Sequence, residues 1–237
     1  MKINQKLEHV LQRVQKPGRY VGGELNSVVK DPAQVDVRFA FCFPDTYEIG
    51  MSHLGIKILY GAMNEIPYFW CERVFAPWVD MEEEMRREDI SLYALESGDP
   101  VSQFDFIGFT LQYELSYTNV LNMLELAGIP LRSKDRHGLF NIVVGGGPCA
   151  CNPEPLADFF DIFFLGDGEE VDIEVMELYR QCKKEGKTKL EFLERAAQIE
   201  GVYVPAFYEV AYNEDGTVKA YTPTNGAPAT VKKRAIM

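Results

Sequence analysis

The chain has 237 residues, of which 46% are hydrophobic and 25% charged, a composition typical of a globular protein with one large domain. Its 24 Lys and Arg against 36 Asp and Glu give a formal net charge of -12, which argues against direct binding of nucleic acid. No apolar run is long enough to span a membrane and the first residues lack the apolar core of a signal peptide, so we expect a cytoplasmic protein without membrane contact.

The first predicted element is an N-terminal helical arm within residues 1–30. Four apolar residues recur at helical spacing before Pro17-Gly18 ends the pattern: Leu7, Val10, Leu11 and Val14. Because one face of this helix is apolar, we expect the arm to lie against another part of the protein.

Residues 31–186 predict an α/β domain with a doubly wound, flavodoxin-like sheet of five parallel strands. Residues 37–43 form a nearly continuous apolar run, typical of a strand buried on both faces, and a helical pattern over residues 51–63 follows it. Four more strands are predicted, most of them followed by a helix: residues 71–75, 104–111, 140–144 and 161–165. This alternation implies right-handed crossovers and helices on both faces of the sheet.

Two spacings predict where helices begin. In each, the first side chain can accept a hydrogen bond from the backbone N–H three residues on, and a glutamate at that position can reach back, as in a capping box. The pairs are Asp80 with Glu83 and Thr188 with Glu191.

Residues 187–222 predict an appendage that consists of one helix and a β-hairpin. Residues 207–212 and 218–221 have strand-like composition and flank the turn sequence Asp215-Gly216. We interpret residues 223–237 as a linker toward a further domain.

The candidate ligand-binding residues follow the predicted strands. In an open parallel sheet, ligands bind beyond the carboxyl ends of the strands, where helix N-termini and loop amides converge. The candidates are Pro44, Asp45, Tyr47, Ser52 and His53 after the first strand, Gln112 and Glu114 after the third, Gly145, Gly146, Gly147 and Pro148 after the fourth, and Gly166 and Gly168 after the fifth.

The glycines among these candidates permit two interpretations. The run at residues 145–147 either lets the backbone approach a ligand closely or makes a sharp turn. After Gly166-x-Gly168, Glu169 and Glu170 stabilise a helix N-terminus and would repel a phosphate. Since neither a P-loop nor a Gly-x-Gly-x-x-Gly motif after the first strand is present, binding of ATP or a dinucleotide by those routes is not indicated.

Histidine and cysteine residues provide no catalytic residue and no metal site. His53 lies at a predicted helix start, where a capping or surface role competes with ligand binding. Cys149-x-Cys151 supplies two thiols, too few to hold a metal ion. The five cysteines lack a disulfide-framework spacing, so we expect reduced structural thiols.

Three segments carry a family resemblance: FPDTYEIGMSHLGIKILY, FDFIGFTLQYELSYTNVLNML and VVGGGPCACNPEPLADFFDIFFLGDGEE. Over roughly residues 18–170, the chain resembles the N-terminal half of an uncharacterised family of cobalamin-binding-type radical-SAM proteins. Three of that family's patterns have counterparts here. The proline after the first strand corresponds to Pro44, and Gly-Glu-Gly-Glu corresponds to Gly166-Asp167-Gly168-Glu169. Gly-Gly-Pro-His corresponds to Gly146-Gly147-Pro148, with Cys149 in place of the histidine.

Two departures from related proteins limit what the resemblance implies. The Asp-x-His-x-x-Gly motif, whose histidine ligates cobalt in one class of cobalamin domains, is absent, so we do not expect His53 to ligate cobalt. The Cys-x-x-x-Cys-x-x-Cys trio that holds a 4Fe-4S cluster is absent too. We therefore expect the cluster and S-adenosylmethionine in a radical-SAM domain beyond Met237, with this chain as an inactive N-terminal fragment.

The resemblance leaves two functional hypotheses open. In the first, the domain positions cobalamin or a substrate over the radical-SAM domain of a methyl- or other group-transferase. In the second, Tyr47, Tyr113 and Tyr117 fill the site, and the domain recruits a substrate or partner without bound corrinoid. A free-standing flavodoxin-like enzyme is disfavoured because no nucleophile with an adjacent base can be named.

Overall fold

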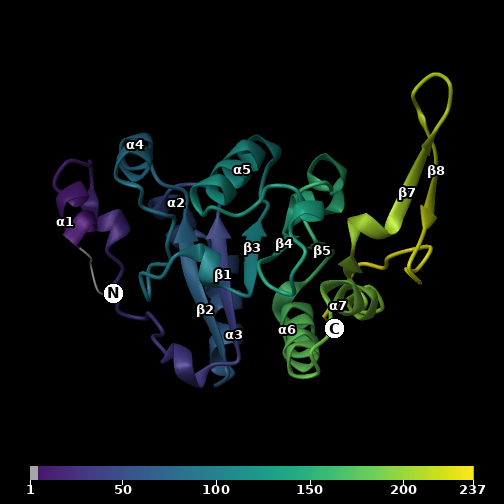
Figure 1. Ribbon diagram of the computed structural model, residues 1–237, viewed down its shortest axis with the longest axis horizontal. Helices are drawn as coiled ribbons and strands as arrows, with labels where there is room; N and C mark the ends of the chain where they lie inside the picture. The colour runs from purple at the N-terminus through teal and green to yellow at the C-terminus, as the bar shows by residue number, and fades with distance from the viewer. Residues whose placement is uncertain (1–4, 237) are drawn as a thin grey trace.

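The computed structural model describes residues 5–236 and contains a six-stranded sheet with the order β2-β1-β3-β4-β5-β6 (Figure 1). Five strands are parallel and β6 is antiparallel to β5. The strands are β1 (Val37–Phe43), β2 (Phe69–Phe75), β3 (Phe106–Thr110), β4 (Ile142–Gly146), β5 (Ile162–Phe164) and β6 (Val202–Tyr203). The predicted doubly wound fold with flavodoxin-like order is confirmed. The two-residue β6 is too short to produce a strand pattern in the sequence.

The helices cover both faces of the sheet, as right-handed crossovers require. The chain passes from β1 to β2 in one direction through α3 (Leu54–Glu65) and returns to β3 through α4 (Val79–Glu88), which places these helices on opposite faces. Helix α6 (Gly168–Lys184) contacts α3 on one face. On the other face, side-chain hydrogen bonds join α4 to α5 (Tyr117–Leu126).

The N-terminal segment covers the outer edge of the sheet. Strand β2 is an edge strand, yet all seven of its residues are buried. The Trp70 indole N–H donates to the Val28 carbonyl at 2.9 Å, and the Arg73 guanidinium binds Glu24 at 3.1 Å. Helix α1 (Gln5–Leu11) contacts α4, so the predicted arm lies against the domain. The covered edge has no free strand on which another chain could pair.

The structure confirms one predicted capping box and corrects the other. Helix α7 (Lys189–Ala196) begins with reciprocal bonds between Thr188 and Glu191. Helix α4 instead has Trp78 as its N-cap, without a side-chain cap. The Asp80 prediction was wrong because the carboxylate lies within the first turn, where it accepts the Gln15 backbone N–H at 2.6 Å.

The predicted helix over residues 51–63 is divided into two. Helix α2 (Tyr47–Ser52) ends before His53, and α3 begins immediately after it. His53 has extended backbone angles, and its Nδ1 accepts the Ile56 N–H at 3.3 Å, so it caps α3. The capping role considered for this histidine is thereby confirmed.

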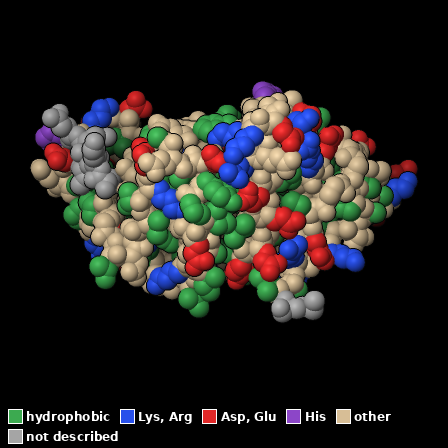
Figure 2. Space-filling view, turned by 90° about the horizontal axis from the view of Figure 1, so that it is seen from below, with side chains coloured by type: hydrophobic (Ala, Val, Ile, Leu, Met, Phe, Trp, Pro, Cys, Tyr) green, Lys and Arg blue, Asp and Glu red, His purple; other side chains and the backbone are tan. Residues whose placement is uncertain are grey.

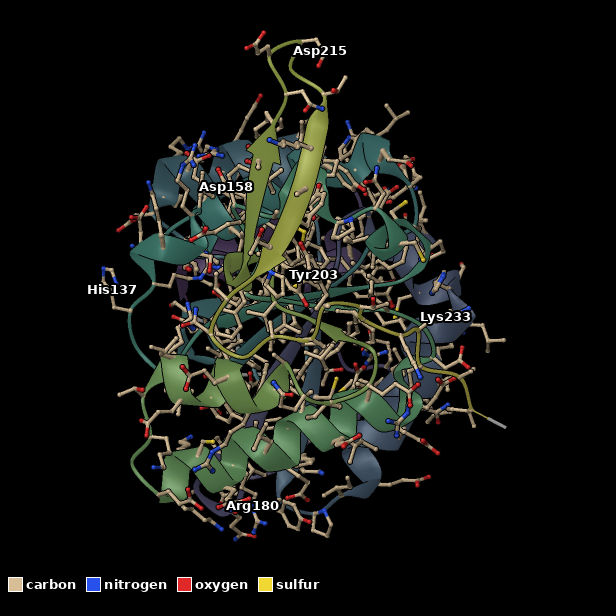
Figure 3. The ribbon with its side chains drawn as sticks, turned by 90° about the vertical axis from the view of Figure 1, so that its right-hand side faces the viewer. His137, Asp158, Arg180, Tyr203, Asp215 and Lys233 are labelled. Atoms are coloured by element: carbon tan, nitrogen blue, oxygen red, sulfur yellow. The ribbon has the colours of Figure 1, made fainter. Side chains whose placement is uncertain are left out.

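The C-terminal hairpin projects from the domain, and the chain then returns to the sheet. Strands β7 (Tyr208–Tyr212) and β8 (Val218–Pro223) pair antiparallel, with Asp215 at the exposed tip (Figure 3). Beyond them, Arg234 donates its N–H to the Leu165 carbonyl at 2.8 Å and accepts the Asp167 N–H at 3.2 Å. The segment interpreted as a linker therefore contacts the carboxyl end of β5.

The surface is of mixed charge, and no described helix is long and apolar enough to cross a membrane. On the face seen in Figure 2, Asp and Glu side chains are interspersed with Lys and Arg.

A buried carboxylate connects the sheet to the appendage. Asp161 lies directly before β5 with a fully buried side chain. It accepts the Val143 N–H at 2.8 Å and binds the Arg136 guanidinium at 3.0 Å, the Lys189 ammonium at 2.7 Å and the Ser133 hydroxyl. The cations come from the loop before β4 and from α7, so Asp161 holds three parts of the chain together.

We expect Asp161→Ala to lower the free energy of unfolding by about 3–5 kcal/mol, because two buried cations lose their partner. Urea unfolding followed by circular dichroism measures this change. The control is Asp158→Ala, since Asp158 pairs with Arg132 at the surface, where its side chain is 69% exposed. Equal stability losses in the two variants would contradict the account.

Candidate functional site

A cavity of about 230 Å³ lies at the carboxyl ends of β1, β3, β4 and β5, between the sheet and helices α3 and α6. The strand order reverses between β1 and β3, so the cavity lies at the switch point where open α/β sheets bind ligands. Its volume is just below the range of about 300–1,000 Å³ usual for small-molecule sites. The cavity is therefore suited to a small ligand or to one group of a larger ligand.

Aromatic rings and glycines form the sheet side of the cavity. Because alternate residues of a strand share a face, Phe39 and Phe41 of β1 both line it. A Cβ atom at Gly108 of β3 would clash with the Phe39 ring, so only glycine lets that ring lie over the strand. On β4, Val144 and Gly146 lie on the same face of the sheet and both line the cavity, and Gly146 has no side chain to fill it.

The opposite wall comes from the beginnings of two helices. His53 and Leu59 line the cavity from the α3 side, and Gly168 is the first residue of α6. Asp172 lies one turn further along α6 and is only 6% exposed. A Cβ atom at Gly168 would lie 3.3 Å from Asp172 Oδ2, so the carboxyl turns back toward the first turn of the helix.

The carboxyl group of Asp172 has no hydrogen bond or ion pair with any residue between 5 and 236. Burial raises the pKa of its carboxyl group to about 8, and the negative charge of Glu169 adds to the shift. The group is therefore mainly protonated at pH 7. An unsatisfied carboxyl in a cavity at this sheet edge is a feature of ligand-binding sites.

The three glycines of the run after β4 have different roles. A Cβ atom at Gly145 would lie 2.8 Å from the Phe160 ring, on the side away from the cavity. Gly146 faces the cavity and has room for a methyl group, 3.8 Å from the Phe164 Cβ. Gly147 has φ 96° and ψ -178°, a conformation that only glycine adopts readily. The turn considered for this run is therefore made at Gly147, and Gly146 is the residue that leaves room for a ligand.

The structure brings part of the predicted set together. Six candidates line the cavity: His53, Gln112, Gly146, Gly147, Gly166 and Gly168. Gln112 donates from Nε2 to the Thr110 hydroxyl at 2.6 Å, which fixes its amide at the mouth of β3. The remaining candidates lie outside the lining of the cavity.

Those remaining candidates lie on the surrounding loops or in the core. The Asp45 carboxylate accepts the Tyr113 hydroxyl at 3.3 Å, which links the loops after β1 and β3. Tyr47 turns away and donates to Glu24 at 2.9 Å. Ser52 bonds to a carbonyl of its own helix, Glu114 and Pro148 are exposed, and Pro44 and Gly145 are buried.

Several lining residues were not predicted from the sequence. Phe39 and Phe41 were assigned only to a buried strand, since nothing in an apolar run marks the residues next to a void. Asp172 lies between apolar positions of α6, and this acidic residue on the buried side of a helix was a signal that could have been used. None of Tyr47, Tyr113 and Tyr117 lines the cavity.

No group of three potential metal ligands occurs among the described residues. Cys42, Cys71 and Cys182 are buried, Cys149 is half-buried and Cys151 is exposed. Burial alone raises the pKa of the Cys42 thiol, as expected for a structural side chain.

The chain is a doubly wound α/β domain with a cavity at the switch point of its sheet. The chain belongs to the family described as radical SAM proteins, N-terminal, whose family model matches residues 55–205. It is also 28% identical over 148 residues to an uncharacterised protein of Methanocaldococcus jannaschii. That match covers 62% of this chain and 28% of the relative. No solved structure matches the chain. The radical-SAM resemblance is thus confirmed.

We expect Gly147→Ala to lower the free energy of unfolding by about 1–3 kcal/mol, because its backbone conformation is strained for any residue with a Cβ. Gly146→Ala should change it by less than about 0.5 kcal/mol, since the methyl group enters open space. Denaturant unfolding of both variants gives the comparison. A Gly146→Ala variant as unstable as Gly147→Ala would show that the cavity wall is wrongly assigned.

Proposed function

We propose that this chain is the ligand-positioning domain of a radical-SAM enzyme. The observation that carries the proposal is the cavity at the switch point of the sheet, with the unsatisfied carboxyl of Asp172 on its wall. Family membership supports the link to radical-SAM chemistry. The 4Fe-4S cluster and S-adenosylmethionine would be held by another part of the full enzyme, a methyl- or other group-transferase, which this domain would contact.

Cobalamin is the proposed cofactor, bound mainly outside the cavity. A corrinoid is much larger than 230 Å³, so only one of its side groups would enter, while the macrocycle would lie over the surrounding loops. The carboxylates of Asp45, Glu114 and Asp167 on these loops suit the amide N–H groups of a corrinoid. His53 is engaged in capping α3, so a cobalt ligand from this residue is not part of the proposal. When bound, cobalamin would supply a transferable methyl group.

A second candidate function is an interaction module without bound corrinoid. Leu115, on the loop after β3, is 85% exposed, and Ile49 of α2 is 52% exposed. Such exposed apolar side chains after β1 and β3 favour contact with another part of the enzyme or with a partner. This hypothesis expected Tyr47 and Tyr117 to fill the site, but both side chains are half-buried against the core.

Hydroxocobalamin binding tests the proposal. We expect the protein to retain corrin absorbance after desalting, and Gly146→Ala to weaken retention by about tenfold or more, which corresponds to about 1.4 kcal/mol of binding free energy. Gly138→Ala is the matched control, because its methyl group also enters open space but lies outside the cavity lining.

Two outcomes would contradict the cobalamin proposal. One is the absence of retained corrinoid from incubations at millimolar concentration. The other is equal retention by the wild type and Gly146→Ala, since a corrinoid side group that enters the cavity must meet the added methyl group. Either result would favour the interaction module.

A further inference from the structure

The lack of a partner for Asp172 is unusual among the buried acidic residues of this chain. Glu72 binds Arg38, Glu96 binds Arg73 and Asp161 binds Arg136, so each of these buried carboxylates faces a cation. Asp172 is buried to a similar extent and has no partner within residues 5–236. Since the carboxyl faces the cavity and has no partner among the described residues, a ligand that enters the cavity can satisfy it.

The charged groups around the cavity favour a positively charged ligand. Asp167 and Glu169 line it together with Asp172, and no Lys or Arg is found among the described lining residues. His53 Nδ1 accepts the Ile56 N–H, so this nitrogen bears no proton. An anionic ligand would meet carboxylates without a compensating cation.

The shape of the wall favours a flat ligand. Phe39 and Phe41 are in edge-to-face contact, with ring centroids 6.0 Å apart, and both line the cavity. Gly108 of β3 and Gly146 of β4 add no side chains of their own to this wall. Aromatic rings attract cations through their negatively polarised faces, and planar N–H groups match the two oxygens of a carboxylate.

We propose that the cavity binds a flat organic cation, an amidinium or a guanidinium, whose N–H groups donate to Asp172 while its carbon frame packs on Phe39 and Phe41. The inference rests on the proposed ligand-positioning function; it assigns the cavity to a cationic group of the substrate and thereby replaces the corrinoid side group as its occupant. The cation is part of the substrate, or a substrate side group, that the domain positions.

The proposal predicts a specific dependence on pH. The pKa of Asp172 is about 8 without ligand, so a cation must displace a proton from the carboxyl group before it can pair with a carboxylate. The affinity should therefore be about tenfold weaker at pH 7 than at pH 9, in proportion to the ionised fraction. The other titratable groups at the cavity are His53, Asp167 and Glu169. Any effect of these groups on the affinity is still present in a variant that lacks only the Asp172 charge, so the variant isolates the effect of Asp172.

Benzamidine and benzamide are suitable probes, because they share size and shape and differ in charge. We expect calorimetry at pH 9 to show saturable binding of benzamidine, with benzamide at least tenfold weaker. Asp172→Asn keeps the shape of the side chain and should lose at least tenfold in benzamidine affinity and most of the dependence on pH. Asp158→Asn is the control for an exposed aspartate, and a melting curve checks the folding of both variants.

Three results would overturn the inference: no saturable benzamidine binding below about 10 mM, equal affinity for the two probes, or unchanged affinity in Asp172→Asn. The comparison of two probes on the wild type stands even if a variant fails to fold. Retained hydroxocobalamin without benzamidine binding would reject the cation while leaving the cobalamin proposal intact. Benzamidine binding without retained corrinoid would reject the cobalamin proposal and leave the cation proposal intact.

Discussion

The cavity at the carboxyl edge of the sheet contains one buried carboxyl group, that of Asp172, which no described residue binds. With a pKa of about 8 in the folded chain, the group holds a proton that the unfolded chain, with a pKa near 3.9, releases at lower pH. Its presence therefore lowers the stability of the folded state progressively as the pH rises from about 4 to about 8. Asp161 is a buried aspartate paired with two cations, whereas Asp172 has no such pair among the described residues, which is why we propose that a ligand completes it.

The space in front of Asp172 exists because glycines stand where side chains would fill it. Gly108 accommodates the Phe39 ring, Gly146 adds no side chain beside Val144, and Gly168 lets the carboxyl turn toward the helix start. Gly166 has a further role, because a Cβ atom there would clash with the Arg234 carbonyl. The tail, anchored by ion pairs of Arg234 with Glu170 and Glu174, thus lies beside the cavity.

The sheet and its order could be predicted because buried parallel strands leave long apolar runs and each crossover leaves a helical pattern. The loops after the strands could be located for the same reason, and four of the five candidate glycines line the cavity, all except Gly145. What the sequence could not show is which face of a strand meets a void, as for Phe41, or which acidic residue lacks a partner, as for Asp172. The Asp80 cap failed because the helix begins two residues earlier than the spacing indicated, with Trp78 as its N-cap.

The most direct test of the central claim is an NMR titration of the Asp172 carboxyl carbon in the ligand-free protein, with the signal assigned by comparison with Asp172→Asn. The account predicts a midpoint near pH 8, because the group is buried in a cavity without a partner. A midpoint near the ordinary aspartate value of about 3.9 would contradict it, since the carboxylate would then be solvated or paired and would need no ligand.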